Sequence, residues 1–115
     1  KWDLSQLDRI ATISEFDDCY TAHDGGYRDG ADYYNRAGAR HVLDAIVVPT
    51  LIITAQDDPF IPYSMFTVPT IQQHPHIRVV APRYGGHCGF FHRGRIGEDP
   101  YWAENRIVDF LLGRL

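Results

Sequence analysis

Several features are scarce in this sequence of 115 residues. It has 2 cysteines, Cys19 and Cys88, whose wide spacing favours free thiols and a reducing, cytoplasmic environment. Its 11 lysines and arginines are scattered and the net charge is −4, which argues against nucleic acid as a partner. No apolar run is long enough to cross a bilayer. These shortages disfavour disulfide-built, nucleic-acid-binding and membrane-spanning classes.

The N-terminal part predicts short helices around a modest core. A hydrophobic fraction of 44% is close to the globular average. Apolar residues at a rough three-residue spacing predict a helix over residues 4–13, and Asp29 can cap another after the glycine-bearing loop at residues 23–30. A further helical stretch is expected at residues 41–46. Residues 1–46 are therefore predicted to form a helical connecting segment.

The pattern becomes regular from residue 47 onward. Apolar runs at residues 47–54 and 77–80 are continuous rather than alternating, which is typical of parallel strands covered on both faces. A helix-length connection lies between them, so residues 47–115 predict a strand-helix-strand-helix unit. The last helix is expected to be amphipathic. Its packed side is predicted to hold Ala103, Ile107, Phe110 and Leu111, and its solvated side Glu104, Arg106 and Asp109.

Two strands are too few for a stable sheet of this kind. Parallel strands need neighbours and helices on both faces, and a two-stranded sheet leaves an edge open to other chains. Because the chain also begins without Met, we expect it to be a fragment of a larger α/β protein. We also expect the isolated chain to associate with itself through the exposed strand edge.

Two polar loops follow the two predicted strands. Asp57 and Asp58 come after the first strand, and Gly85-Gly86-His87 comes after the second. Open α/β sheets place their sites at the carboxyl ends of strands, so we expect these loops to meet. A histidine can take the proton of a nucleophile, and a carboxylate can orient the imidazole and stabilise its cation. His87 and Asp58 are therefore candidates for the base and acid of a hydrolytic triad, with Asp57 as the alternative acid.

Simpler interpretations exist for each of these groups. Asp-Asp-Pro is a common turn, and glycines beside a histidine also mark turns. The joint order of the two loops after two strands favours the catalytic interpretation. A metal site at His74 and His76 with His92 lacks a cysteine or carboxylate set at ligand spacing, so we expect neither a metal nor a cofactor.

Several short stretches carry a resemblance to a known family. They are Glu15-Phe16-Asp17-Asp18, Tyr20-Thr21-Ala22, Asp32-Tyr33-Tyr34, Val48-Pro49-Thr50-Leu51-Ile52-Ile53, Ala55-Gln56-Asp57-Asp58-Pro59-Phe60, Gly85-Gly86-His87-Cys88-Gly89-Phe90 and Trp102-Ala103-Glu104. In this order they resemble the carboxyl-terminal third of an α/β-hydrolase, and more narrowly of the YheT-like branch, whose members are described as esterases, lipases and acyltransferases. The resemblance implies an α/β fold fragment: the last two parallel strands with flanking helices, and lid-region helices in residues 1–46. It places the acid four residues before a proline, which favours Asp58 over Asp57.

The nucleophile of that family has no counterpart in this chain. A nucleophile elbow needs Gly-x-Ser-x-Gly, and Ser5, Ser14 and Ser64 have no glycine two residues away. Cys88 directly follows His87, and neighbouring side chains on an extended segment point apart. The resemblance therefore implies the C-terminal part of a serine hydrolase or acyltransferase that acts on a small acyl ester and is inactive alone.

Aromatic residues near the two loops are candidates for a substrate pocket. Phe60, Phe90 and Phe91 could line an apolar acyl site, and core packing is the alternative for the last two. A function of a different class also fits the open sheet. In that alternative the chain is a non-catalytic, self-associating α/β module derived from a hydrolase.

Overall fold

The computed structural model describes residues 4–94 and 96–115, which divide into two compact units. The division follows Val42. The boundary expected from the sequence, after residue 46, lies slightly further along the chain. The N-terminal and C-terminal units are described separately.

The N-terminal unit is built from short helices. In chain order these are η1 (Leu7–Arg9), α1 (Ile13–Phe16), the π-helix η2 (Asp17–Thr21), α2 (Ala22–Asp24), α3 (Gly30–Ala37) and η3 (Ala39–His41). The prediction of a single helix over residues 4–13 is wrong, because a capping box starts α1 only at the end of that range. The Thr12 hydroxyl accepts from the Glu15 N–H at 3.2 Å, and the Glu15 carboxylate accepts from the Thr12 N–H at 3.0 Å. The helix predicted after Asp29 is confirmed, since the Asp29 carboxylate caps α3.

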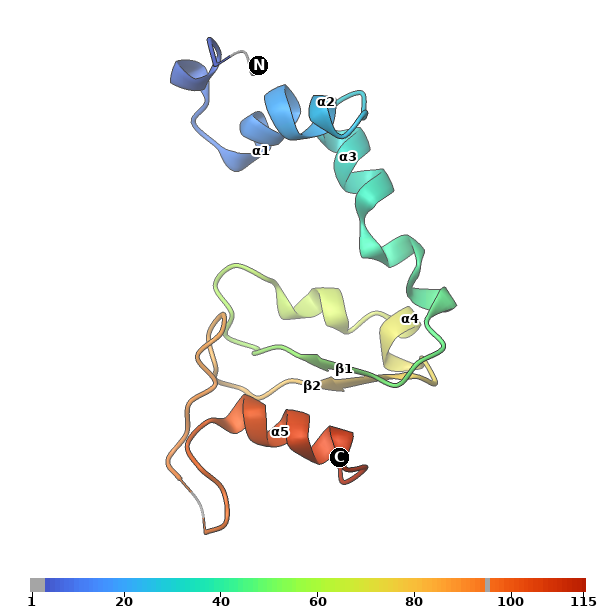
Figure 1. Cartoon of the computed structure of the whole chain (residues 1–115), viewed down its shortest axis with the longest axis vertical. Helices are drawn as coiled ribbons and strands as arrows, with labels where there is room; N and C mark the ends of the chain where they lie inside the picture. The colour runs from blue at the N-terminus through green and yellow to red at the C-terminus, as the bar shows by residue number, and fades with distance from the viewer. Residues whose placement is uncertain (1–3, 95) are drawn as a thin grey trace. The chain divides into compact units, whose positions relative to one another are not determined.

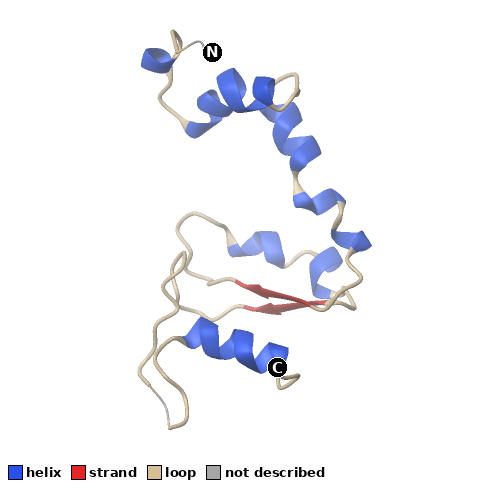
Figure 2. Ribbon diagram, in the orientation of Figure 1, coloured by secondary structure: helices blue, strands red, loops and turns tan. Residues whose placement is uncertain are grey.

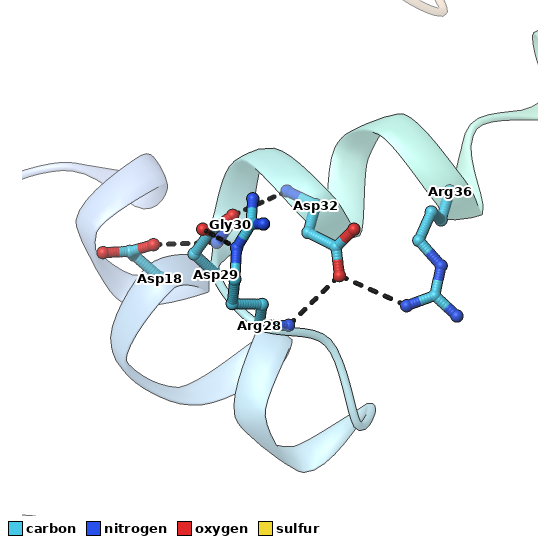
Figure 3. Close-up of polar contacts among 6 residues, drawn as sticks. All are labelled: Asp18, Arg28, Asp29, Gly30, Asp32 and Arg36. Atoms are coloured by element: carbon cyan, nitrogen blue, oxygen red, sulfur yellow. Dashed lines mark hydrogen bonds and ion pairs between the residues drawn. The ribbon is translucent and has the colours of Figure 1, made fainter.

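Carboxylates join the helices of this unit to one another (Figure 3). The Gly30 N–H, at the start of α3, donates to Asp18 Oδ1 in η2 at 2.7 Å. Asp32 Oδ2 accepts from the Arg28 backbone N–H at 3.1 Å and from the Arg36 guanidinium at 3.2 Å. These bonds tie α3 both to η2 and to the loop that precedes it, so the acidic residues of this unit serve its architecture.

The C-terminal unit has the predicted strand-helix-strand-helix order. Its elements are η4 (Leu43–Ala45), β1 (Thr50–Ile53), η5 (Tyr63–Phe66), α4 (Pro69–Gln72), β2 (Ile77–Val80) and α5 (Trp102–Leu111). β1 and β2 pair in parallel, with Thr50 opposite Ile77 and Ile53 opposite Val80. Residues 63–72 lie on one side of this sheet and α5 lies on the other (Figures 1 and 2). The α/β class and the parallel pairing are thus confirmed. The helical stretch predicted over residues 41–46 is replaced by the short 3-10 helices η3 and η4.

The core of the C-terminal unit is small. Its buried apolar residues in the described part of the chain are Ala55, Ile71 and Ile77, joined by the buried Thr54. β1 is only half-buried along its whole length. Two strands therefore leave much of their apolar surface incompletely covered. No helix within the described residues has the length and apolar character needed to span a membrane.

The packed side of α5 differs from the prediction. Ile107 and Leu111 are 46% and 75% exposed, whereas the Arg106 side chain is only 18% exposed. The Arg106 guanidinium lies 5.8 Å from the centre of the Trp102 ring and forms an ion pair with Glu98. The prediction of a solvated Arg106 and packed Ile107 and Leu111 is therefore wrong, because the loop before α5 supplies Arg106 with an inward-facing partner.

Candidate active site

The loops that follow β1 and β2 start side by side. Because the strands are parallel, both loops leave the same end of the sheet. Backbone bonds continue past the strands: the Thr54 N–H donates to the Val80 carbonyl at 3.2 Å, and the Gln56 N–H to the Pro82 carbonyl at 2.9 Å. The Gln56 side-chain amide adds a bond to the Ala81 carbonyl at 2.9 Å. The acid-bearing and base-bearing loops are thus joined at their origins.

Asp58 and His87 lie in direct contact beyond these bonds. Asp58 Oδ2 is 3.0 Å from His87 Nδ1, and Oδ1 is 3.3 Å from the same nitrogen. Oδ1 also accepts from the backbone N–H groups of Phe60 at 2.8 Å and Ile61 at 3.0 Å. The Asp58 side chain is 5% exposed and that of His87 is 50% exposed. Asp58 therefore forms the expected turn and holds the histidine as well.

The surroundings of Asp58 keep it ionised. Burial acts to raise the pKa of its carboxyl, but the N–H groups of Ile61 and Phe60 and the His87 imidazole outweigh burial and lower the pKa below the ordinary value. An ionised carboxylate can only accept hydrogen bonds, so the hydrogen lies on His87 Nδ1. Among the described residues, none bonds to Nε2. That nitrogen belongs to a half-exposed ring and has no partner within the part of the chain that the structure describes.

The second aspartate of the pair has a different partner. Asp57 Oδ1 accepts from the backbone N–H groups of Gly85 and Gly86, each at 2.9 Å. Asp57 thus bonds the glycine turn, and Asp58 bonds the histidine that follows it. The sequence did not identify these glycine contacts. Asp57 lies in a turn in which the Asp58 N–H donates to the Ala55 carbonyl at 3.5 Å, so strand alternation gives no signal for these contacts.

The three candidate pocket phenylalanines occupy different places. The exposed Phe60 ring meets the His87 ring edge-on, with centroids 5.3 Å apart. The Phe90 ring stacks on Trp102 at 5.9 Å, and Phe91 contacts Tyr101 at 5.8 Å. The structure therefore brings Phe60, but neither of the others, into ring contact with His87. Phe90 and Phe91 instead share a cavity of about 350 Å³, lined among the described residues by Pro82, Arg83, Tyr84, Phe90, Phe91, His92 and Trp102.

The other histidines and the cysteines lie apart from this pair. His74 and His76 precede β2, at the opposite end of the sheet, and their rings are 6.0 Å apart. The His76 N–H donates to His74 Nδ1 at 3.2 Å. Within residues 4–94 and 96–115, no group of three or more His, Cys, Asp or Glu side chains could hold a metal ion. Cys19 and Cys88 are both exposed and not joined in a disulfide.

Several hydrolases are similar to this chain in sequence. It is 40% identical over 108 residues to "Putative esterase YheT" of Escherichia coli strain K12. The aligned region covers 94% of this chain and 31% of that protein. It is 38% identical over 88 residues to phospholipase ABHD3 of Mus musculus, covering 76% of this chain and 21% of that protein. It is 29% identical over 111 residues to monoacylglycerol lipase ABHD2 of Homo sapiens, covering 94% and 26%.

The chain spans less than a third of the length of these relatives. No protein-family model matches it, and no solved structure matches it significantly. The similarity to the YheT protein extends over nearly the whole chain. It confirms the resemblance predicted from the short motifs.

Proposed function

This chain is a YheT-like portion of an α/β-hydrolase, and on that premise we propose that it supplies the acid and base of a carboxylic-ester hydrolase or acyltransferase. His87 is the general base and then the general acid, and Asp58 orients its imidazole. The observation that carries this proposal is the 3.0 Å contact between His87 Nδ1 and the largely buried Asp58 carboxylate. The names of the relatives, an esterase, a phospholipase and a monoacylglycerol lipase, support ester substrates.

The proposed reaction needs a serine from outside these 115 residues. Its hydroxyl oxygen attacks the ester carbonyl while His87 Nε2 takes the hydroxyl proton. The same proton then passes to the leaving alcohol, which departs as the acyl-serine forms. Water attacks the acyl-serine in the same way and releases the acid, whereas an alcohol in place of water gives acyl transfer. Without the serine, we expect the 115-residue chain to be inactive.

The surroundings of His87 suggest where the substrate lies. Phe60 is exposed and contacts the base, so we propose that it borders the apolar part of the ester. Phe90 and Phe91 line a cavity of their own, and a role for that cavity in binding the acyl chain stays a prediction. Residues 1–46 are proposed to correspond to a lid region, on the family resemblance alone.

The test is ester hydrolysis by the full-length protein that contains this chain. With a short p-nitrophenyl ester, His87→Ala is expected to lower kcat/KM on the order of 10⁶-fold, and Asp58→Asn on the order of 10⁴-fold because the imidazole loses its tautomeric restraint. His76→Ala, an exposed histidine at the other end of the sheet, is the control and should retain activity. Near-normal turnover by the His87 variant would overturn the proposal.

A second candidate function follows from the sheet itself. β1 and β2 form a sheet of two strands, and each has an open edge among the described residues. We propose, as the alternative, a non-catalytic module that self-associates through such an edge. Light scattering after size exclusion should then show a dimer or larger species of the 115-residue chain. A monomer at all concentrations would exclude this alternative.

A further inference from the structure

The loop that carries His87 is anchored by a side chain that the proposed mechanism does not use. Asp57 Oδ1 accepts from two consecutive backbone N–H groups, those of Gly85 and Gly86, at 2.9 Å each. Two converging N–H groups form a small concave anion site. Here the protein's own carboxylate fills that site. These N–H groups are therefore engaged, and they hold the backbone immediately before the base.

The Asp57 bonds extend a ladder that otherwise stops short of the base. Backbone bonds between the two loops reach as far as Pro82, which accepts from the Gln56 N–H. Beyond that point, the bonds across the loops at Gly85, Gly86 and His87 come from the Asp57 and Asp58 side chains. The two aspartates thus replace the backbone as the connection between the loops.

The glycine turn is shaped so that its N–H groups face Asp57. A Cβ on Gly85 would lie 2.7 Å from the Phe90 ring and 3.0 Å from the Ala55 Cβ, so this backbone is seated against both. Ala55 is fully buried. Gly86 has φ of +57°, a conformation that side-chain-bearing residues seldom adopt. The turn is thus held by packing against Phe90 and Ala55 and by the bonds to Asp57.

We propose that Asp57 is a positioning residue that fixes His87 against Asp58 by anchoring the N–H groups of Gly85 and Gly86. The catalytic consequence rests on the function proposed for His87 and Asp58. Without Asp57 the turn keeps its packing and the bonds that the Gly85 carbonyl accepts from the N–H groups of Gly89 and Phe90. The N–H groups of Gly85 and Gly86 lose their acceptor, so His87 can move away from Asp58. A displacement of about 1 Å at a catalytic group can cost about 100-fold in rate.

The first experiment compares kinetics in the full-length protein. Asp57→Ala removes the acceptor and is expected to lower kcat about 100-fold with KM nearly unchanged. Asp57→Asn keeps an oxygen acceptor and should stay within about tenfold of the wild type. Asp44→Ala, an exposed aspartate near β1 and outside both loops, is the control. A kcat for Asp57→Ala within a factor of two of the wild type would overturn the proposal.

A double-mutant cycle distinguishes a positioning role of Asp57 from a purely structural role. If Asp57 acts through His87, Asp57→Ala should have little further effect on the residual activity of His87→Ala. A purely structural role would lower the activity of both backgrounds by the same factor. Equal factors would therefore reject the proposal even if Asp57→Ala is strongly impaired.

The second experiment needs no activity and uses the full-length protein labelled uniformly with 15N and 13C. In the wild type, the ring nitrogen shifts of His87 should report the Nδ1–H tautomer, and scalar couplings should connect the Gly85 and Gly86 N–H groups to the Asp57 carboxyl carbon. In Asp57→Ala, the Nδ1–H share should fall. Absent couplings in the wild type, or an unchanged tautomer in a folded variant, would contradict the anchor. This readout stands even if His87→Ala leaves ester hydrolysis intact, so it separates the two proposals.

Discussion

The carboxylates of both units bond backbone N–H groups, but only those of the C-terminal unit connect two loops at the end of a sheet. In the N-terminal unit, the carboxylates of Glu15, Asp18 and Asp29 bond backbone N–H groups at helix starts. In the C-terminal unit, strands and buried apolar residues form the framework, and Asp57 and Asp58 face the loop that carries the histidine. Acidic residues in a sequence therefore say little about a site until their partners are known.

The comparison also explains why only one unit holds a candidate site. The stretch Glu15-Phe16-Asp17-Asp18 carries three carboxylates, and all three are engaged within the N-terminal unit. Glu15 completes a capping box, Asp17 accepts from the Thr21 hydroxyl, and Asp18 accepts from the Gly30 N–H. In contrast, Asp58 bonds a half-exposed imidazole whose other nitrogen can meet a ligand.

The largest expected effect on stability comes from a substitution in the apolar core of the C-terminal unit. Ile71, in α4, is 6% exposed, so Ile71→Ala should destabilise this unit by about 2–4 kcal/mol through lost burial and a residual cavity. Urea denaturation followed through the NMR signal of the Trp102 indole measures it. Ile96→Ala is the control, because this isoleucine is fully exposed and should change stability by less than about 0.5 kcal/mol. Equal losses in the two variants would show that α4 does not form the core.

A smaller effect is expected from the capping box of the N-terminal unit. Thr12→Ala removes the hydroxyl that accepts from the Glu15 N–H and should cost about 1 kcal/mol. Amide exchange of residues in α1 reports the loss, and Thr12→Ser should restore most of the protection because it keeps the hydroxyl. Undiminished protection of α1 in Thr12→Ala would mean that other contacts hold this helix.

The smallest expected effect, counted per carboxyl group, is the pH dependence of stability, and it differs between the two units. Hydrogen bonds lower the pKa of four carboxyls in the N-terminal unit: the N–H groups of Ala11 and Thr12 at Glu15, the Thr21 hydroxyl at Asp17, the Arg28 guanidinium at Asp29 and the Arg28 N–H at Asp32. The C-terminal unit has one such group among the described residues, Asp58.

A carboxyl whose pKa is lower in the folded state stabilises the fold above its unfolded pKa, near 3.8 for Asp and 4.5 for Glu. That stability is lost as the pH falls through the lowered folded value. The N-terminal unit should therefore lose its dispersed amide signals before the C-terminal unit in an acid titration by NMR. High salt should bring together the pH values at which the two units lose these signals, because salt screens exposed charged groups. Earlier loss of the C-terminal unit would contradict the contrast between the units.

Much of the framework could be predicted because its signals are local. The apolar run at residues 77–80 coincides with β2, and the Asp29 cap begins α3, since both depend on neighbouring residues only. The inner side of α5 could not be predicted in the same way. Arg106 turns inward because Glu98 lies in the loop before the helix, and no periodicity in the helix contains that information.

The candidate site, like the framework, could be predicted only in part. Two parallel strands bring the loops after them together, so the contact between Asp58 and His87 follows from order and strand direction. The bonds from Asp57 to Gly85 and Gly86 depend on where two backbone N–H groups point. The place of Phe90 likewise depends on the φ of +39° at that residue and on Trp102, which the local sequence does not reveal.

The adjacency of Asp57 and Asp58 makes the acid loop sensitive to length. Each aspartate reaches its own partner from a tight turn, in which the Asp58 N–H donates to the Ala55 carbonyl at 3.5 Å. Losing or gaining one residue between Thr54 and Asp57 would change this turn and shift both carboxylates from their partners. A single-residue insertion or deletion therefore removes both side-chain links between the loops at once, whereas a substitution removes one at a time.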